Sequence, residues 1–224
     1  MAKNFTEIAY SEAVLAMQRK MNAVEINAEL QHSVGRNSIT PALAVYLGSR
    51  ISFYLATASA AGQPYIQHRG GPPGFIRALD AQTLAFPDFE GNKQYITLGN
   101  LSENPRVQLF FMDYGRRQRL KIWGRAAVVE DDEKLLALVT PEAWRRPLRR
   151  AIRVAVEAWD VNCPAYIPQL FTVDEVEAAH AAMLGRIAEL EAEIASLKEA
   201  AAASRPATKP DAKGAVPKSR QKPR

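Results

Sequence analysis

The chain has 224 residues, 47% of them hydrophobic, and a net charge of +5. This length can bury a substantial core, so we expect one domain with appendages. The single cysteine excludes an intrachain disulfide and a thiolate cluster, and the three histidines lack metal-ligand spacing, so we predict no metal site.

The positive charge belongs to the C-terminal tail. Residues 204–224 carry seven Lys or Arg against one Asp, which leaves 22 basic and 23 acidic residues elsewhere. We therefore do not expect the folded part to bind nucleic acid. The tail is predicted to be disordered and solubilising, with an acidic partner, nucleic acid or an anionic membrane as alternatives. No apolar run reaches the roughly 20 residues of a membrane span, and the N-terminus lacks a signal pattern, so a soluble cytoplasmic protein is expected.

Residues 1–39 are expected to form a short helix followed by a polar surface segment that leads to the next element. Apolar residues recur at helical spacing between Tyr10 and Ala23, whereas residues 22–37 are polar and weakly patterned. Thr40 and Pro41 then form a good helix start, with Thr as N-cap and Pro in the first turn, and the helix extends to Gly48.

Residues 50–93 are the centre of the predicted fold. The run from Ile51 to Ala58 is apolar at nearly every position, which predicts a strand buried on both faces. A glycine-bearing turn separates it from a strand over 64–69, and residues 75–79 and 83–86 form a second hairpin.

The following elements predict a mainly β (α+β) fold. We expect a helix over 94–101, strands over 106–113, 119–129 and 151–159, and a helix after Asp131-Asp132. Lys121 lies on an unusually basic face of the 119–129 strand. Six or seven strands at meander spacing favour a small closed or split β-barrel with peripheral helices.

A long helix is predicted over 172–203. Thr172 and Glu175 have capping-box spacing. Apolar residues then follow a heptad pattern, with Leu in one seam and Ile in the other, which favours a parallel two-stranded coiled coil. An amphipathic helix lying on its own barrel is the equal alternative.

Several cations lie on or near the central strands, and they suit a phosphate monoester: Arg69, Arg77, Lys93, Arg119 and Lys121. Any barrel also exposes cations to solvent, so ordinary surface positions are the alternative. His68 and Cys163 could bind or react, although a structural role is commoner for each. No Ser-His-Asp or paired-carboxylate arrangement supports hydrolysis.

Three segments together carry a resemblance: SFYLATASAAGQPYIQHRGGPPGF (52–75), LAFPDFEGNKQYITLGNLSENPRV (84–107) and RLKIWGRA (119–126). They resemble the pyridoxamine 5′-phosphate oxidase-related FMN-binding split barrels, in particular an uncharacterised branch. The resemblance implies a six-stranded antiparallel split barrel over 40–171, and a homodimer with FMN at the subunit interface.

The resemblance also implies cofactor-binding positions, with several departures from the family pattern. A phosphate-contacting Arg is replaced by Gln67, with Arg69 on the same face two residues later, and an aromatic-Thr pair is replaced by Phe86-Pro87. The full predicted set is Gln67, His68, Arg69, Arg77, Phe86, Asp88, Asn92, Lys93 and Arg119.

The implied function is an FMN-dependent oxidoreductase acting on a small substrate. No catalytic residue is assigned. The W-R-x-R-P segment of true pyridoxamine phosphate oxidases does not follow the last strand, so vitamin B6 oxidation is not predicted. The alternatives are a flavin- or haem-binding carrier or sensor without turnover, and a deazaflavin-dependent reductase.

Overall fold

The computed structural model describes residues 4–25, 36–142, 148–162 and 165–204. The helices are α1 (Phe5–Ala9), α2 (Glu12–Lys20), α4 (Pro41–Gly48), α5 (Ile96–Glu103), α6 (Glu133–Val139) and α7 (Val173–Ala203). The strands are β1 (Ser52–Ala58), β2 (Pro64–Gly70), β3 (Arg77–Ala78), β4 (Thr83–Pro87), β5 (Arg106–Asp113), β6 (Gln118–Val129) and β7 (Ala151–Asn162).

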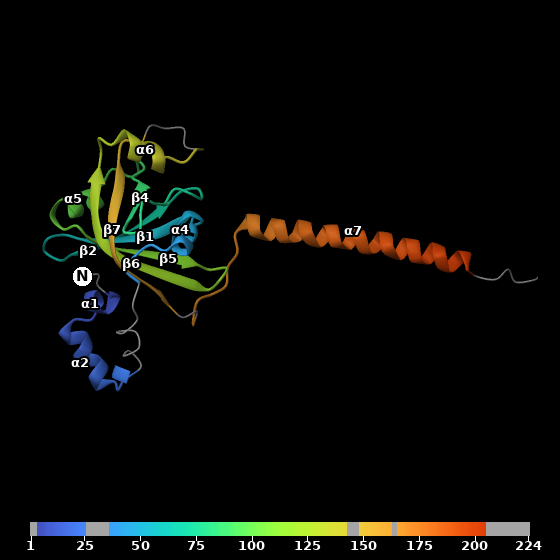
Figure 1. Ribbon diagram of the computed structural model, residues 1–224, viewed down its shortest axis with the longest axis horizontal. Helices are drawn as coiled ribbons and strands as arrows, with labels where there is room; N and C mark the ends of the chain where they lie inside the picture. Colours follow the sequence, from blue (N-terminus) through green and yellow to red (C-terminus); the bar gives the residue numbers. More distant parts are fainter. Residues whose placement is uncertain (1–3, 26–35, 143–147, 163–164, 205–224) are drawn as a thin grey trace, which may run out of the picture. The chain divides into compact units, whose positions relative to one another are not determined.

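The strands form one antiparallel sheet in the order β2-β1-β5-β6-β7-β4-β3, which curves strongly (Figure 1). This confirms the mainly β fold with peripheral helices and a long C-terminal helix. The sheet has seven strands rather than six, because the two residues of β3 pair with β4. The hairpin β1–β2 pairs Leu55 with Gln67 across the strands.

Phenylalanines fill the centre of the sheet's concave side. The Phe53 ring stacks on Phe111 with a centroid distance of 5.0 Å and meets Phe86 edge-on at 4.9 Å. All three side chains are buried, together with Leu55 and Ile122. This packed core leaves the strand ends and the connecting loops to form the site.

Local sequence patterns determine most of the helix starts. The Thr40 hydroxyl accepts a hydrogen bond from the Leu43 amide at 3.2 Å, and the Asp132 carboxylate accepts one from the Leu135 amide at 2.9 Å. Both caps were predicted from the sequence, and both begin a helix whose apolar side chains reach the core.

One expectation about β1 was wrong. Phe53, Leu55 and Thr57 are buried, but Tyr54 between them is 42% exposed, so the strand is buried on one face only. The apolar run could not reveal this, since Tyr and Ala are tolerated on either face of a strand.

The chain forms two units, residues 1–170 and residues 171–224. In the second unit, the predicted capping box is present at Thr172 and Glu175. The domain boundaries at 39, 171 and 203 remain predictions. Cys163, His32 and the tail after residue 204 lie outside the described residues, as does most of the 22–37 connection. Across the described ranges, no helix combines the length and apolar character needed to cross a membrane.

Candidate functional site

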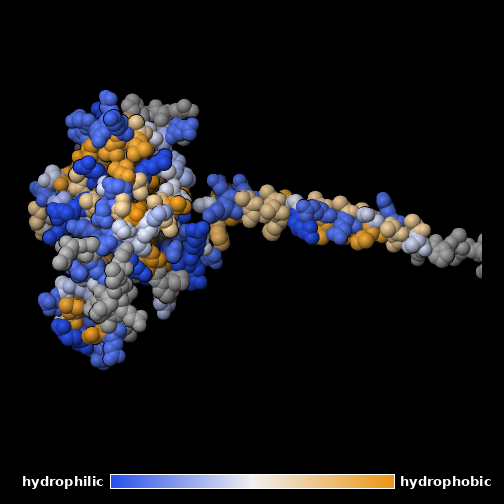
Figure 2. Space-filling view, viewed as in Figure 1, coloured by the Kyte–Doolittle hydropathy of each residue, from blue (hydrophilic) through white to orange (hydrophobic). Residues whose placement is uncertain are grey.

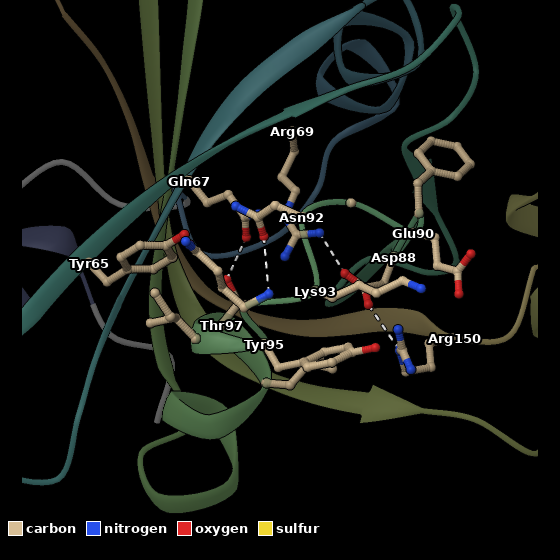
Figure 3. Close-up of a pocket in the computed structure, with 15 residues that line it drawn as sticks. Tyr65, Gln67, Arg69, Asp88, Glu90, Asn92, Lys93, Tyr95, Thr97 and Arg150 are labelled. Atoms are coloured by element: carbon tan, nitrogen blue, oxygen red, sulfur yellow. Dashed lines mark hydrogen bonds and ion pairs between the residues drawn. The ribbon is translucent and has the colours of Figure 1, made fainter.

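A small polar pocket lies between β2, the loop after β4 and the start of α5 (Figure 3). Its volume is about 50 Å³. By this measure it holds a few water molecules or a group of similar size, not an aromatic ring system. Strand β2 contributes Tyr65, Gln67 and Arg69, which share one face because side chains alternate along a strand.

Two arginines lie on opposite sides of one carboxylate in this pocket. Asp88 Oδ1 lies 2.5 Å from Arg69 Nη1, and Asp88 Oδ2 lies 3.0 Å from Arg150 Nε. The Asp88 and Arg69 side chains are only 8% and 10% exposed. Such shielding from solvent strengthens the interaction and makes removal of either partner costly.

Sheet pairing explains how Arg150 reaches Asp88. Pro87 at the end of β4 is paired with Ala151 at the start of β7. Asp88, just after β4, and Arg150, just before β7, therefore lie side by side. The Asp88 amide donates a hydrogen bond to the Arg150 carbonyl at 3.0 Å. The Arg150 guanidinium also lies 5.7 Å from the centre of the Tyr95 ring.

The start of α5 borders the pocket with backbone N–H groups. Its N-cap, Tyr95, is in the left-handed conformation at φ 55° and its side chain makes no capping hydrogen bond. Lys93 is also left-handed, at φ 61°. Ile96, Thr97 and Leu98 of the first turn line the pocket. An uncapped helix start offers N–H donors and a positive dipole end to an anion.

Gln67 and Thr97 fix β2 against α5. The Thr97 hydroxyl donates to Gln67 Oε1 at 2.7 Å, and Thr97 is buried. The hydrogen bond holds the pocket-facing side of β2 beside the helix start (Figure 3). The two elements that carry the cations and the N–H donors are thus held together.

The hydrogen bonding of Arg69, which lines the pocket, is incomplete within the described part of the chain. Arg69 Nε is buried and has no hydrogen-bond partner among the residues that the structure describes. The pocket-lining cations are Arg69, Lys93 and Arg150, and its carboxylates are Asp88 and Glu90. Lys93 is exposed at the rim. A buried orphan guanidinium nitrogen beside a helix start fits an anionic oxygen, because such a bond would satisfy it.

The structure brings together five of the predicted site residues: Gln67, Arg69, Asp88, Asn92 and Lys93. The other four lie elsewhere. His68 points to the opposite face of β2, beside Tyr54 at a ring distance of 5.6 Å. Phe86 belongs to the core, and Arg77 is exposed on β3.

Arg119 lies on β6, outside this pocket, and no described residue forms a hydrogen bond with its buried Nε. Lys121 lies two residues further on the same face. Burial lowers the pKa of Lys121 below the ordinary lysine value, and Arg119 lowers it further, while Asp160 opposes the shift. This basic strip of β6 is separate from the pocket.

Sequence reasoning missed Arg150 and Thr97. Arg150 is 62 residues from Asp88 in the chain, so only the β4–β7 register could have revealed the contact. Thr97 was visible as a polar residue in the first turn of a predicted helix, but its partner Gln67 is 30 residues away.

A family model described as pyridoxamine 5′-phosphate oxidase matches residues 39–163. No curated protein matches the chain. Among solved structures, a putative pyridoxamine 5′-phosphate oxidase from Lactobacillus delbrueckii is 23% identical over 57% of this chain and 97% of its own, with a TM-score of 0.43. An FMN-binding protein from Syntrophomonas wolfei is 15% identical over 66% of this chain and 97% of its own, with a TM-score of 0.41. A single-residue variant of HupZ from group A Streptococcus is 21% identical over 55% of this chain and 99% of its own, with a TM-score of 0.45.

Proposed function

Since the chain belongs to the pyridoxamine 5′-phosphate oxidase family, we propose that it binds FMN and acts as a flavin-dependent oxidoreductase on a small substrate. The observation that carries the proposal is that Arg69, which lines a pocket beside the uncapped start of α5, has a buried Nε without a hydrogen-bond partner in the described part of the chain. The FMN phosphate would lie in this pocket.

The residues present fit a phosphate monoester. Arg69 would donate from its free Nε, the first turn of α5 would donate backbone N–H groups, and Lys93 would neutralise charge at the rim. Asp88 holds Arg69 and Arg150 in place rather than binding the anion itself, because its two oxygens already accept from the two arginines. Arg77 has no part in this phosphate site.

A pocket of about 50 Å³ would accommodate the phosphate but not the flavin ring. The isoalloxazine ring would lie outside, where a second subunit of a homodimer would cover it. A bound flavin supplies the electron-transfer chemistry, and the protein orients it and excludes competing reactions. No residue of the chain is assigned as an acid or base.

The test is an absorption spectrum of the purified protein, with the released cofactor identified by mass. The proposal predicts flavin bands, release of FMN, and bleaching of the bands by a nicotinamide donor. A yellow protein that is never reduced would favour a carrier or sensor. A Soret band would instead indicate haem, and release of a deazaflavin would indicate a reductase of that class.

A further inference from the structure

Helix α7 exposes a continuous apolar seam. We define the seam as Val176, His180, Met183, Ile187, Leu190, Ile194 and Leu197, which follow one another at alternating spacings of four and three residues. Its six apolar members are each 40–62% exposed. Figure 2 shows hydrophobic residues along α7 between hydrophilic ones. A helix of 31 residues with this pattern needs a partner to remove the seam from water.

We propose that the seam pairs with the same seam of a second copy of this chain, in a parallel, in-register, two-stranded coiled coil. The pairing is independent of flavin binding. It would hold two barrels at a high local concentration whether or not the barrels also contact each other.

The last four residues of the seam have the types that favour a two-stranded parallel coil. Counting heptads from the seam places Ile187 and Ile194 at a positions, and Leu190 and Leu197 at d positions. β-branched Ile at a and Leu at d pack best in parallel dimers, because the knobs at these two layers meet their holes in different orientations.

The charged residues flanking the seam are complementary between two parallel copies. Arg186 at a g position would face Glu191 of the partner subunit. Glu193, at the next g position, would face Lys198 of the partner subunit. Neither charged pair is repulsive, so the flanks support the in-register pairing of identical helices.

The same charges would also match in an antiparallel pair, where Arg186 would face Glu193 of the partner subunit. Orientation is therefore decided by the seam rather than by its flanks. In an antiparallel pair each a residue would meet a d residue, and the separate Ile and Leu layers would be lost.

The ion pair within α7 does not oppose the pairing. Arg186 pairs with Glu189 on its own helix at 2.8 Å, but the two side chains are 64% and 68% exposed. Exposed pairs of this kind contribute little, so Arg186 is free to turn toward a partner. Gly185, at the outer f position, has open space around it.

Disulfide crosslinking of the full chain tests the proposal. All variants carry Cys163→Ser, so that each has one thiol. Leu197→Cys places that thiol in the seam, and Ala192→Cys places it on the outer face as the matched control. Under mild oxidation the seam variant should give a crosslinked dimer at least about tenfold faster than the control.

In an antiparallel pair, residue 197 would lie opposite His180 of the partner subunit, about 25 Å along the axis from the other copy of 197. Equal rates for the two variants, no crosslinking, or a trimer by sedimentation would overturn the proposal. As a second readout, adding Ile187→Asp should abolish the crosslink of Leu197→Cys, whereas adding Ala188→Asp on the outer face should retain it. If the crosslink were retained with Ile187→Asp as well as with Ala188→Asp, the proposal would also be overturned.

Discussion

Arg69 Nη1 lies 2.5 Å from Asp88 Oδ1, and this ion pair joins β2 to the loop that follows β4. Strand β2 is at one end of the sheet order and β4 is next to the other end. Curvature of the sheet therefore brings the regions near its two edges together. The Arg69–Asp88 pair links these regions beside the pocket. The pair is at once a structural link and the foundation of the proposed anion site.

Replacing Asp88 should destabilise the fold. In Asp88→Asn the Arg69 guanidinium would remain largely buried without its counter-charge, and Arg150 would lose a partner. We expect the free energy of unfolding to fall by about 3 kcal/mol, measured by urea denaturation. Glu90→Gln is the matched control, because Glu90 is exposed in the same loop and should change stability little. If Asp88→Asn lowered the free energy of unfolding no more than Glu90→Gln, the ion pair would have no structural role.

Lys93→Ala should weaken FMN binding, whereas Arg77→Ala should not. Loss of a charged donor to phosphate costs about 1.5–3 kcal/mol, which corresponds to roughly a 10- to 150-fold rise in Kd. Both residues are exposed cations near the central strands, but only Lys93 borders the pocket. Quenching of flavin fluorescence on binding measures both constants. If Arg77→Ala raised the Kd for FMN more than Lys93→Ala did, Arg77 would instead be a phosphate contact, as the family resemblance implied.

Gly124→Ala should destabilise the sheet. A Cβ at Gly124 would run into the Ala155 carbonyl oxygen and would lie 2.9 Å from Val154 Cγ1, at the register shift between Trp123 and Gly124. We expect a loss of about 1–3 kcal/mol in the free energy of unfolding. Gly99→Ala in α5 is the control, since that position has open space and Ala favours helix. A stable Gly124→Ala protein would exclude this close approach.

Lys121 should make stability depend on alkaline pH. Its pKa is lowered in the folded state by burial, so the unfolded chain binds its proton more tightly. The side chain therefore reduces stability at neutral pH, and this cost disappears as the pH rises through the unfolded value near 10.5. Lys121→Gln should unfold at higher urea than the wild type at pH 7, and the difference should shrink by pH 10.5. A constant difference across this range would rule out titration of Lys121 as its cause.

The sequence predicted much of the fold because its information was local. Hairpins, caps at Thr40, Asp132 and Thr172, and the alternation of Leu120 and Ile122 on β6 each depend on neighbours a few residues apart. The exposed position of Tyr54 was missed, since an apolar run does not reveal which strands cover each face.

The predicted site was confirmed in part: the pocket contains Gln67 and Arg69 of β2 and Asp88, Asn92 and Lys93 of the loop after β4. Gln67 and Arg69 were expected on one face and lie there, whereas His68 between them points away. Phe86 was expected beside the cofactor because of the family pattern, but it packs against Phe53 in the core. Arg150 depended on strand register, which no local pattern determines.

The most direct test of the proposed phosphate pocket compares FMN with riboflavin, which has the same ring and lacks the phosphate. Titration of the flavin-free wild-type chain, followed by flavin fluorescence, should give a Kd for FMN at least about tenfold below that for riboflavin. Equal affinities for the two flavins, or no binding of either, would contradict an FMN site anchored by Arg69, Lys93 and the start of α5.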